Sequence, residues 1–456
     1  MRGSGGEAPP SDPAVERWFG FCDRLGERME HRRLTTFSAA TLVVANMVGA
    51  GVFTTSGYAL ADHERGVVLL AWLVGGVLAI CGCLAYGALG RRFPHSGGEY
   101  ELLRRTIHPL AGFLAGWVSL LAGFTAPIAF AAAAFGRYLG PVLGIDAGPW
   151  LGTFAILVAG GLHLRGARLG ARSQDVVVVL KVVLIVAFLV FGAAQLLGGS
   201  STETVPLPPA RSFDLAAFAV TCVWVSFAYS GWNAASYVAG EIDDAERSLP
   251  RALLLGTLVT AALYLGLNAV FVYAAPVEVL AGKAEIGLLA ADALGGAWLE
   301  RAVAGVVALA LFTSIAAMMM AGPRVYARMA ADGFLPRVLA SGADHRPAIL
   351  LQITLALVAL WTQSLDSLMT YIGWTLSVSS AMTVCGLIRV RLREGADAVP
   401  VPGWPVVPAF YVLVTLAIAA FSFSDRPTEA SAGLGTLCLG ALAYAVAVRR
   451  GASVAR

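Results

Sequence analysis

Long apolar runs, separated only by short polar segments, extend along the chain from residue 34 to residue 448. Each run is close to the ~20 residues that a helix needs to cross the hydrocarbon core of a bilayer. The pattern therefore predicts an all-α integral membrane protein. Its twelve transmembrane helices are expected at residues 34–60, 66–89, 110–135, 147–164, 176–199, 215–240, 252–277, 302–323, 347–365, 367–388, 404–424 and 430–448.

The composition agrees with a membrane protein and argues against several other classes. Of 456 residues, 58% are hydrophobic and 13% are charged, whereas soluble domains average about 25% charged residues. The net charge of +3 is spread along the chain, without the concentrated basic face of a nucleic-acid-binding protein. The six cysteines fall almost wholly inside apolar runs, so we expect no disulfide framework, no metal site and no cofactor.

The positions of the basic residues predict the orientation in the membrane. Lys and Arg near short loops are held on the cytoplasmic side. If both termini are cytoplasmic, 25 of the 32 Lys and Arg residues lie on that side. Residues 1–33 carry Arg and Glu throughout, without an apolar core or a cleavage signal, and are interpreted as a retained cytoplasmic tail. We expect a multi-pass protein of the cell (inner) membrane.

Two of the predicted helices are interrupted at their midpoints, the first by Gly49–Gly51 and the sixth by Tyr229–Trp232. Glycines in membrane helices also permit close packing, which is the alternative explanation. The two helices lie five apart in the order and therefore cross the membrane in opposite directions, as in an inverted repeat. The expected domains are the tail 1–33, repeat 1 at 34–199, repeat 2 at 200–390, and the last two helices with a short cytoplasmic C-terminus at 391–456.

A broken helix at mid-membrane exposes backbone groups that need a partner. The free N–H groups near Gly49–Phe53 form a positive helix end that suits a carboxylate. Carbonyls around Ala45–Met47 and Ser226–Tyr229 lack helical partners and suit an ammonium group. One anion-binding end beside one cation-binding end predicts a zwitterionic ligand, and an α-amino acid is the obvious candidate.

Several motifs carry a resemblance to a known family. They are VGAGVF at 48–53, RFPHSGGEY at 92–100, FAYSGWNAASYVAGEI at 227–242, ERSLPRAL at 246–253 and GPRVYARMAADGFLP at 322–336. In this order the chain resembles the amino acid, polyamine and organocation (APC) superfamily, near bacterial amino acid permeases and L-type transporters, from about residue 34 to residue 390. The resemblance implies the LeuT-type fold, with a 5+5 inverted repeat, and transport by alternating access.

The resemblance also implies roles for particular residues. Gly49 and Gly51 resemble the carboxylate-binding loop of the family, with Ala50 where many relatives have Ser. Phe227 resembles an aromatic gate above the substrate, although a core aromatic is the alternative, and Asn233 resembles a polar residue near the substrate. The expected substrate-binding residues are Val48, Gly49, Ala50, Gly51, Phe227, Ala228, Ser230 and Asn233.

Lys181 is one of only two lysines in the chain, and it lies inside the fifth apolar run. Its side chain could reach the interface by snorkelling. Ionisable groups buried in the membrane are costly, however, and are usually functional, and a lysine can release its proton where an arginine cannot. In several relatives a lysine resembling this one stands where sodium-driven members bind the ion. We therefore predict that Lys181 contacts the broken part of the first helix and couples proton movement to transport.

The charge of the substrate side chain is predicted from the absence of acidic residues at mid-depth in the spans. No Asp or Glu lies at mid-depth in helices 1, 3, 6, 8 or 10, so a neutral amino acid fits best. The predicted function is proton-coupled symport of neutral L-amino acids; the alternatives are a sodium-independent exchanger and a cationic amino acid or polyamine permease. A channel is less expected, and a membrane enzyme would need acid, base or metal groups that these spans lack. The expected partners are the amino acid, a proton and lipid, in a monomer or homodimer.

Overall fold

The structure is a computed structural model. Ten helical segments are long and apolar enough to do so, and the two shorter apolar helices Trp150–Leu164 and Arg346–Thr362 lie where the fourth and ninth spans are predicted. The all-helical membrane protein is therefore confirmed, while the count of twelve spans stays a prediction. The described residues are 34–146, 148–165, 171–198, 213–340 and 345–449, without the side chains of 171–175, so the predicted tail lies outside them.

The first half of the described chain begins at a capped helix, where the Thr35 hydroxyl accepts a hydrogen bond from the Ser38 N–H (3.1 Å). Long apolar runs then form the helices, and a π-helical turn, η1, interrupts the third span. The elements are α2 (Thr36–Met47), α3 (Gly51–Asp62), α4 (Arg65–Arg92), α5 (Gly98–Thr106), α6 (Pro109–Val118), η1 (Ser119–Thr125), α7 (Ala126–Leu143), α8 (Trp150–Leu164) and α9 (Ala171–Leu197).

The second half also consists of apolar helices with capped starts, because the side chains of Asp214 and Ser364 accept hydrogen bonds at the first turns of α10 and α15. The elements are α10 (Leu215–Tyr229), the 3₁₀ helix η2 (Ala234–Glu241), α11 (Ala245–Tyr273), α12 (Val277–Leu280), α13 (Ile286–Ala331), η3 (Arg337–Ala340), α14 (Arg346–Thr362), α15 (Leu365–Glu394), α16 (Val406–Asp425) and α17 (Pro427–Arg449).

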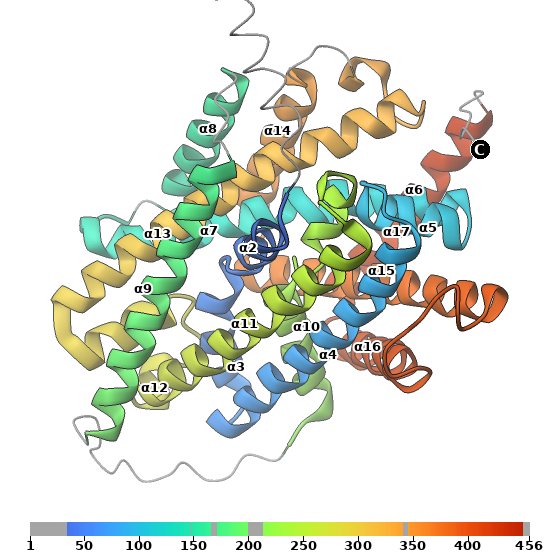
Figure 1. The fold of residues 1–456 in the computed structure, drawn as a ribbon. Coiled ribbons are helices and arrows are strands. Elements are labelled where there is room, and N and C mark those ends of the chain that lie inside the picture. Colours follow the sequence, from blue (N-terminus) through green and yellow to red (C-terminus); the bar gives the residue numbers. More distant parts are fainter. Residues whose placement is uncertain (1–33, 147, 166–170, 199–212, 341–344, 450–456) are drawn as a thin grey trace, which may run out of the picture.

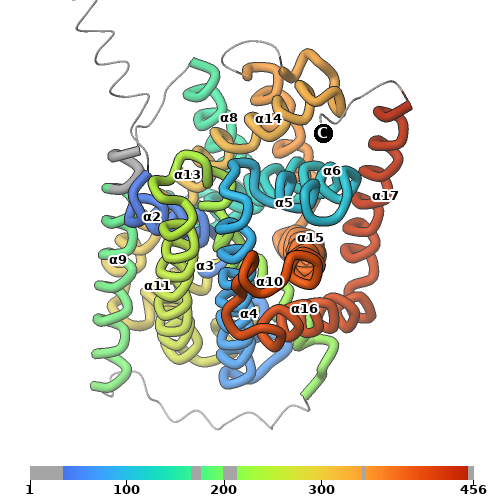
Figure 2. The backbone as a smooth tube through the Cα atoms, turned by 45° about the vertical axis from the view of Figure 1, so that its right-hand side comes forward, coloured from blue at the N-terminus to red at the C-terminus, as the bar shows by residue number. Residues whose placement is uncertain are grey.

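The two interrupted spans lie in the middle of the bundle. Helices α2, α3 and α10 are surrounded by the other helices, whereas α9 and α17 lie at opposite edges (Figure 1). Around this centre α11 packs against α4 and α2, α13 against α7, and α10 against α15 and α16. Figure 2 shows α2 beginning and α17 ending at the same end of the bundle, which we call the terminal side. The other end is called the opposite side.

Two short connecting helices lie where the sequence predicted only loops. On the terminal side α5 follows the second span, and on the opposite side α12 precedes α13. Helix α13 begins at Ile286, well before the predicted residue 302, and Gly296, with φ +69°, separates its first turns from the eighth span. Hydropathy alone does not detect such segments, because they are too short or too polar to resemble spans.

The start of the first span is joined to the end of the sixth. Leu34 and Ile242 form a parallel bridge in which the Leu34 N–H donates to the Glu241 carbonyl (2.7 Å) and the Asp243 N–H donates to the Leu34 carbonyl (3.0 Å). The terminal-side halves of the two interrupted spans, α2 and η2, are thereby held together at their ends.

Candidate functional site

The first span breaks between α2 and α3, as the glycines predict. Helix α2 ends at Met47, α3 begins at Gly51, and the Gly49 N–H turns back to the Met47 carbonyl (2.7 Å). The break lies against the sixth span so closely that a Cβ added at Gly51 would meet the Ala228 Cα at 2.7 Å. A glycine is therefore needed at position 51 for the two chains to approach.

The sixth span breaks at the same depth. Helix α10 ends at Tyr229 and η2 begins at Ala234, and Gly231 between them has a φ of +99°, which favours glycine. A Cβ at Gly231 would lie 2.8 Å from the Asn46 carbonyl carbon. The two breaks thus face each other in van der Waals contact, which confirms the predicted pair of discontinuous helices.

A cavity of about 830 Å³ lies beside the two breaks. All of the predicted substrate-binding residues except Val48 line it. Six of them lie at the two breaks and their flanks, and Asn233 lies just before η2. Its apolar wall comes from η1, α7 and α13. The predicted residues that line the cavity are Gly49, Ala50, Gly51, Phe227, Ala228, Ser230 and Asn233.

The remaining predicted residues take different places. Val48 is fully buried and is not part of the cavity wall. In the third span Phe124, Pro127 and Phe130 line the cavity, whereas the small residues Thr125, Ala126 and Ala129 do not. In the eighth span Ser314, Ala317 and Met318 line it.

The cavity extends from the breaks toward the terminal side. There its wall includes α5 and the end of α13, with Arg104, Arg105, Arg324 and Arg328. Beyond Gly51, no described residue of α3 lines it. In this conformation the cavity therefore extends toward the terminal side and not toward the opposite side.

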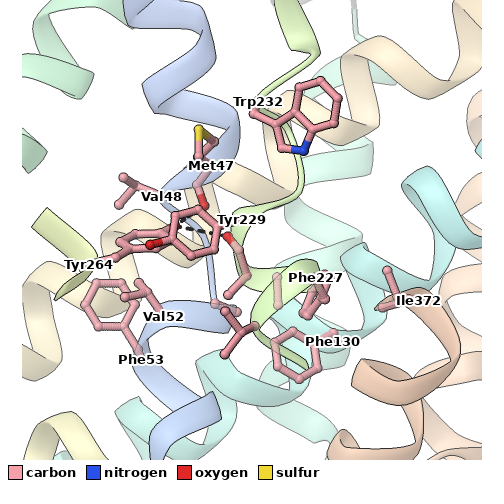
Figure 3. Close-up of a cluster of buried hydrophobic side chains, with 14 of the residues drawn as sticks. Met47, Val48, Val52, Phe53, Phe130, Phe227, Tyr229, Trp232, Tyr264 and Ile372 are labelled. Carbon is pink, nitrogen blue, oxygen red and sulfur yellow. Dashed lines mark hydrogen bonds between the residues drawn. The ribbon is translucent and has the colours of Figure 1, made fainter. Parts of the chain in front are cut away.

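Aromatic side chains close the cavity on the opposite side. Phe227 is buried and meets Phe130 edge to face (Figure 3), with ring centroids 4.9 Å apart. The ring centroids of Phe53 and Tyr138 are 6.3 Å apart. Edge-to-face pairs of this kind add to the stability of a closed apolar layer. The position of Phe227 between the cavity and this layer suits the predicted gate, and its role stays a prediction.

The exposed N–H groups are fewer than the sequence predicted. Gly49 donates to the Met47 carbonyl, and Phe53 donates to the Ala50 carbonyl (3.1 Å). Ala50, Gly51 and Val52 donate their N–H groups to no described residue. The start of α3 therefore offers two cavity-lining donors, Ala50 and Gly51, at a positive helix end.

The predicted ammonium-binding carbonyls already have a partner. Tyr264 of α11 donates its hydroxyl to the Met47 carbonyl, and it lies 3.2 Å from the Ala228 carbonyl (Figure 3). A phenol has one proton for these two acceptors. The Met47 carbonyl makes the shorter contact with Tyr264 and also accepts from the Gly49 N–H, so the Ala228 carbonyl is the one left for another donor. Sequence reasoning missed Tyr264, because α11 has no local irregularity that marks it.

Lys181 reaches the break of the first span from α9. Its side chain is 7% exposed, and its Nζ donates to the Val48 carbonyl at 3.0 Å. The amine therefore neither snorkels to the interface nor enters the cavity, but holds the backbone at the break. Val48, predicted as a substrate ligand, supplies this contact.

Glu99, which the sequence placed in a loop, is the second functional candidate that sequence reasoning missed. It is 5% exposed and lines the terminal-side part of the cavity. Its carboxylate accepts hydrogen bonds from Tyr86 (2.6 Å), Ser379 (2.7 Å) and Asn233 (3.1 Å). The only signal in the sequence is its place beside Gly97 and Gly98, in the motif noted for the family resemblance. Among the described residues, no group of three or more His, Cys, Asp or Glu is placed to hold a metal ion.

Comparison with known proteins assigns the family. Residues 34–444 match the family described as amino acid permease. The chain belongs to the amino acid permease family. The resemblance to the APC superfamily is thereby confirmed, and the family is one of transporters and not of enzymes.

Named relatives agree with this family. The large neutral amino acids transporter small subunit 2 of Rattus norvegicus is 28% identical over 427 residues, which cover 90% of this permease and 80% of the relative. The Asc-type amino acid transporter 1 of Homo sapiens is 26% identical, with 88% and 80% covered. The cystine/glutamate transporter of Homo sapiens is 25% identical, with 91% and 84% covered.

Proposed function

We propose that this permease carries neutral L-amino acids across the cell membrane by alternating access. The observation that carries the proposal is the pair of facing breaks at one end of the cavity, with free N–H donors at Ala50 and Gly51 and shared carbonyls at Met47 and Ala228. A carboxylate binds at the start of α3. The ammonium group takes one of the two carbonyls, and the Tyr264 hydroxyl keeps the other.

A neutral side chain fits the rest of the wall. Near the breaks the cavity is lined by Phe130, Phe227, Ser314, Ala317 and Met318. Glu99 is not among the residues that line the cavity at the breaks, because it lies in the terminal-side part of the wall, behind its hydrogen bond to Asn233. An unpaired charge in an apolar pocket is expensive, so arginine, lysine and polyamines fit less well.

The orientation and the repeat organisation belong to the same proposal. The terminal side is taken as cytoplasmic, because described arginines that the sequence predicts to be cytoplasmic, such as Arg92, Arg104 and Arg328, lie at helix ends on that side. Twelve spans form two inverted repeats, 34–199 and 200–390, followed by α16 and α17. The carrier works as a monomer or homodimer in the bilayer, with the amino acid as its cargo.

The substrate is tested by thermal unfolding of the purified permease against each of the twenty amino acids. A ligand stabilises the state it binds by ~RT ln(1 + [L]/Kd), so neutral L-amino acids are expected to raise the unfolding temperature. Counterflow in proteoliposomes then compares L- with D-amino acids, and a carrier saturates and prefers one enantiomer. Stabilisation only by arginine, lysine or polyamines would overturn the neutral substrate.

Proton coupling through Lys181 is the second part of the proposal. Its amine is buried at the break of the first span, and only a group that can lose its proton serves such a role. Lys181→Gln is expected to abolish uptake driven by a pH gradient, while counterflow without a gradient shows whether exchange persists. Lys283→Gln is the matched control, because the other lysine of the chain is exposed. Equal pH-driven uptake by both variants would remove Lys181 from coupling.

A further inference from the structure

A buried carboxylate joins four separate parts of the chain on the terminal side. Glu99 lies at the start of α5, and its three donors come from α4, from the break of the sixth span and from α15. The donor Asn233 is the predicted substrate-site residue that immediately precedes η2, and it also lines the cavity. One carboxylate therefore links the wall of the substrate cavity to the helices that surround it.

The hydrogen bonds suit the ionised carboxylate. Oε1 accepts from the Tyr86 hydroxyl and the Asn233 amide, and Oε2 accepts from the Ser379 hydroxyl. The two hydroxyl contacts, at 2.6 and 2.7 Å, have the length of bonds to a charged oxygen. Glu99 is the acceptor in all three hydrogen bonds. In the described structure no arginine, lysine or histidine forms an ion pair with it.

The neighbours of Glu99 leave its charge unbalanced. The titratable groups that face it are the phenols of Tyr86 on α4, Tyr237 on η2 and Tyr411 on α16. On α15 it meets Ser379, whereas Arg389 reaches the far end of α5 at the Ile107 carbonyl. Helix α6 contains no titratable residue.

On its own helix, the charges next to Glu99 are already paired. Glu101 forms ion pairs with both Arg104 and Arg105. Burial without a cation raises the pKa of Glu99 above its usual value, although its three hydrogen bonds act in the other direction. Burial without a cation and the three hydrogen bonds thus act in opposite directions on the charged form of Glu99.

We propose that Glu99 is a proton-binding residue whose charge controls how firmly the inner half of the sixth span is held at the substrate cavity. The role in transport rests on the function proposed above, whereas proton binding itself does not. When Oε2 binds a proton, the Ser379 hydroxyl rotates from donor to acceptor, and no other group has to move. Asn233 then loses a charged acceptor and is freed to turn toward the cavity. The proton enters from the terminal side, along the cavity that Glu99 lines.

Glu99→Gln tests the proposal, because glutamine reproduces the shape of the neutral acid and cannot titrate. Infrared difference spectra of the purified permease, recorded between acid and neutral pH, are expected to show a protonated carboxylic acid that is missing in Glu99→Gln. Counterflow by the unchanged permease is expected to depend on the pH on the terminal side, and counterflow by Glu99→Gln is expected not to. Glu101→Gln is the matched control, since this carboxylate lies on the same helix but is ion-paired, and it should leave the band of Glu99 and the pH dependence of counterflow unchanged.

A second variant keeps the test decisive if Glu99→Gln does not fold. Ser379→Ala retains the carboxylate and removes one donor to its charged form. The pH at which the carboxylic acid band reaches half of its intensity is therefore expected to rise by about one pH unit. This is the shift that loss of one hydrogen bond to a charged group produces. An unchanged midpoint in Ser379→Ala, or an acid band that persists in Glu99→Gln, would overturn the proposal.

The infrared titration also separates this proposal from the proposed function. It uses purified protein and needs no substrate. If no amino acid binds or is transported, the proposed function fails while the infrared band still decides whether Glu99 titrates. If transport is present but the band is absent, Glu99 alone is excluded.

Discussion

The opposite-side half of the first span, α3, and the terminal-side half of the sixth, η2, each dock on a short connecting helix, at opposite ends of the molecule. On the opposite side, α3 docks on the segment of α12 and α13, where the Gly282 N–H donates to the Gly57 carbonyl (2.7 Å). On the terminal side, η2 docks on α5, where the Gly97 N–H donates to the Tyr237 carbonyl (3.1 Å). We call these contacts the opposite-side seam and the terminal-side seam.

The two seams differ in their chemistry. In the opposite-side seam the Tyr138 hydroxyl donates to the Phe53 carbonyl (2.6 Å) and accepts from the Gly287 N–H (3.1 Å), so its hydrogen bonds join backbone groups and one phenol. The terminal-side seam has the carboxylate of Glu99 at its centre and borders the cavity. One seam thus depends on steric fit, whereas the other also contains a group that can change its charge.

The largest effect is expected from Gly57→Ala in the opposite-side seam. A Cβ there would lie 1.7 Å from the Lys283 carbonyl oxygen, and this backbone has little freedom to move. Overpacking of this kind costs on the order of 1–3 kcal/mol or more, and we expect a lower unfolding temperature and loss of counterflow. Gly66→Ala, where nothing lies within 4 Å of the added methyl group, is the control. A variant as active as this control would show that the seam is not close-packed.

The second effect concerns the terminal-side seam. Gly98 has a φ of +54°, and a Cβ there would lie 2.5 Å from the ring of Tyr237. Gly98→Ala is expected to be destabilising, but less so than Gly57→Ala because a ring shifts more easily than a backbone carbonyl. Gly144→Ala carries a similar backbone strain, at φ +67°, with nothing within 4 Å. Equal unfolding temperatures for these two variants would mean that the ring contact contributes nothing.

A smaller effect is expected from Tyr138→Phe. The change leaves the ring in place but removes the hydroxyl that joins Phe53 and Gly287, at a cost of roughly 1–3 kcal/mol for buried groups left unpaired. The loss of stability should be the same at acid and neutral pH, because no charge is involved. Thermal unfolding at several pH values measures it, with Tyr273→Phe, at a half-exposed position, as the control. A loss that varies with pH would contradict the comparison of the seams.

The smallest effect is expected from Glu101→Gln. Ion pairs with Arg104 and Arg105 outweigh partial burial and hold the pKa of Glu101 below its usual 4.5. Its contribution to stability is therefore present above that pH and is lost as the pH falls through the lowered pKa. Because the group is partly solvated, the loss in the variant should stay below about 1 kcal/mol near neutral pH. Unfolding temperatures across acid pH check this: the variant should approach the unchanged permease as the pH falls.

The sequence revealed the two broken helices because each break has a local signature. Gly49–Gly51 and Tyr229–Trp232 interrupt otherwise continuous apolar runs, and the structure breaks both helices there. Lys181 was visible as a rare charge inside such a run, and its predicted contact with the broken part of the first helix is the hydrogen bond to the Val48 carbonyl. Its part in coupling stays a prediction.

The missing parts of the site depend on contacts that the sequence does not show. Glu99 looks like a loop residue, and it is buried only because Tyr86, Asn233 and Ser379, at 13, 134 and 280 positions away, gather around it. The same holds for Tyr264, which reaches the two breaks from a regular helix. Without knowledge of the packing, neither residue differs from an ordinary polar or aromatic residue.

The bridge between Leu34 and Ile242 has a mechanical consequence for how the cavity opens. Because α2 and η2 are tied at their terminal-side ends and touch at their breaks, they form a closed frame around part of the cavity rim. A substrate leaving between them must either wait for the two hydrogen bonds of the bridge to part or follow a path outside the frame. The frame therefore favours rotation of α2 and η2 together as one rigid body over independent swinging of α2.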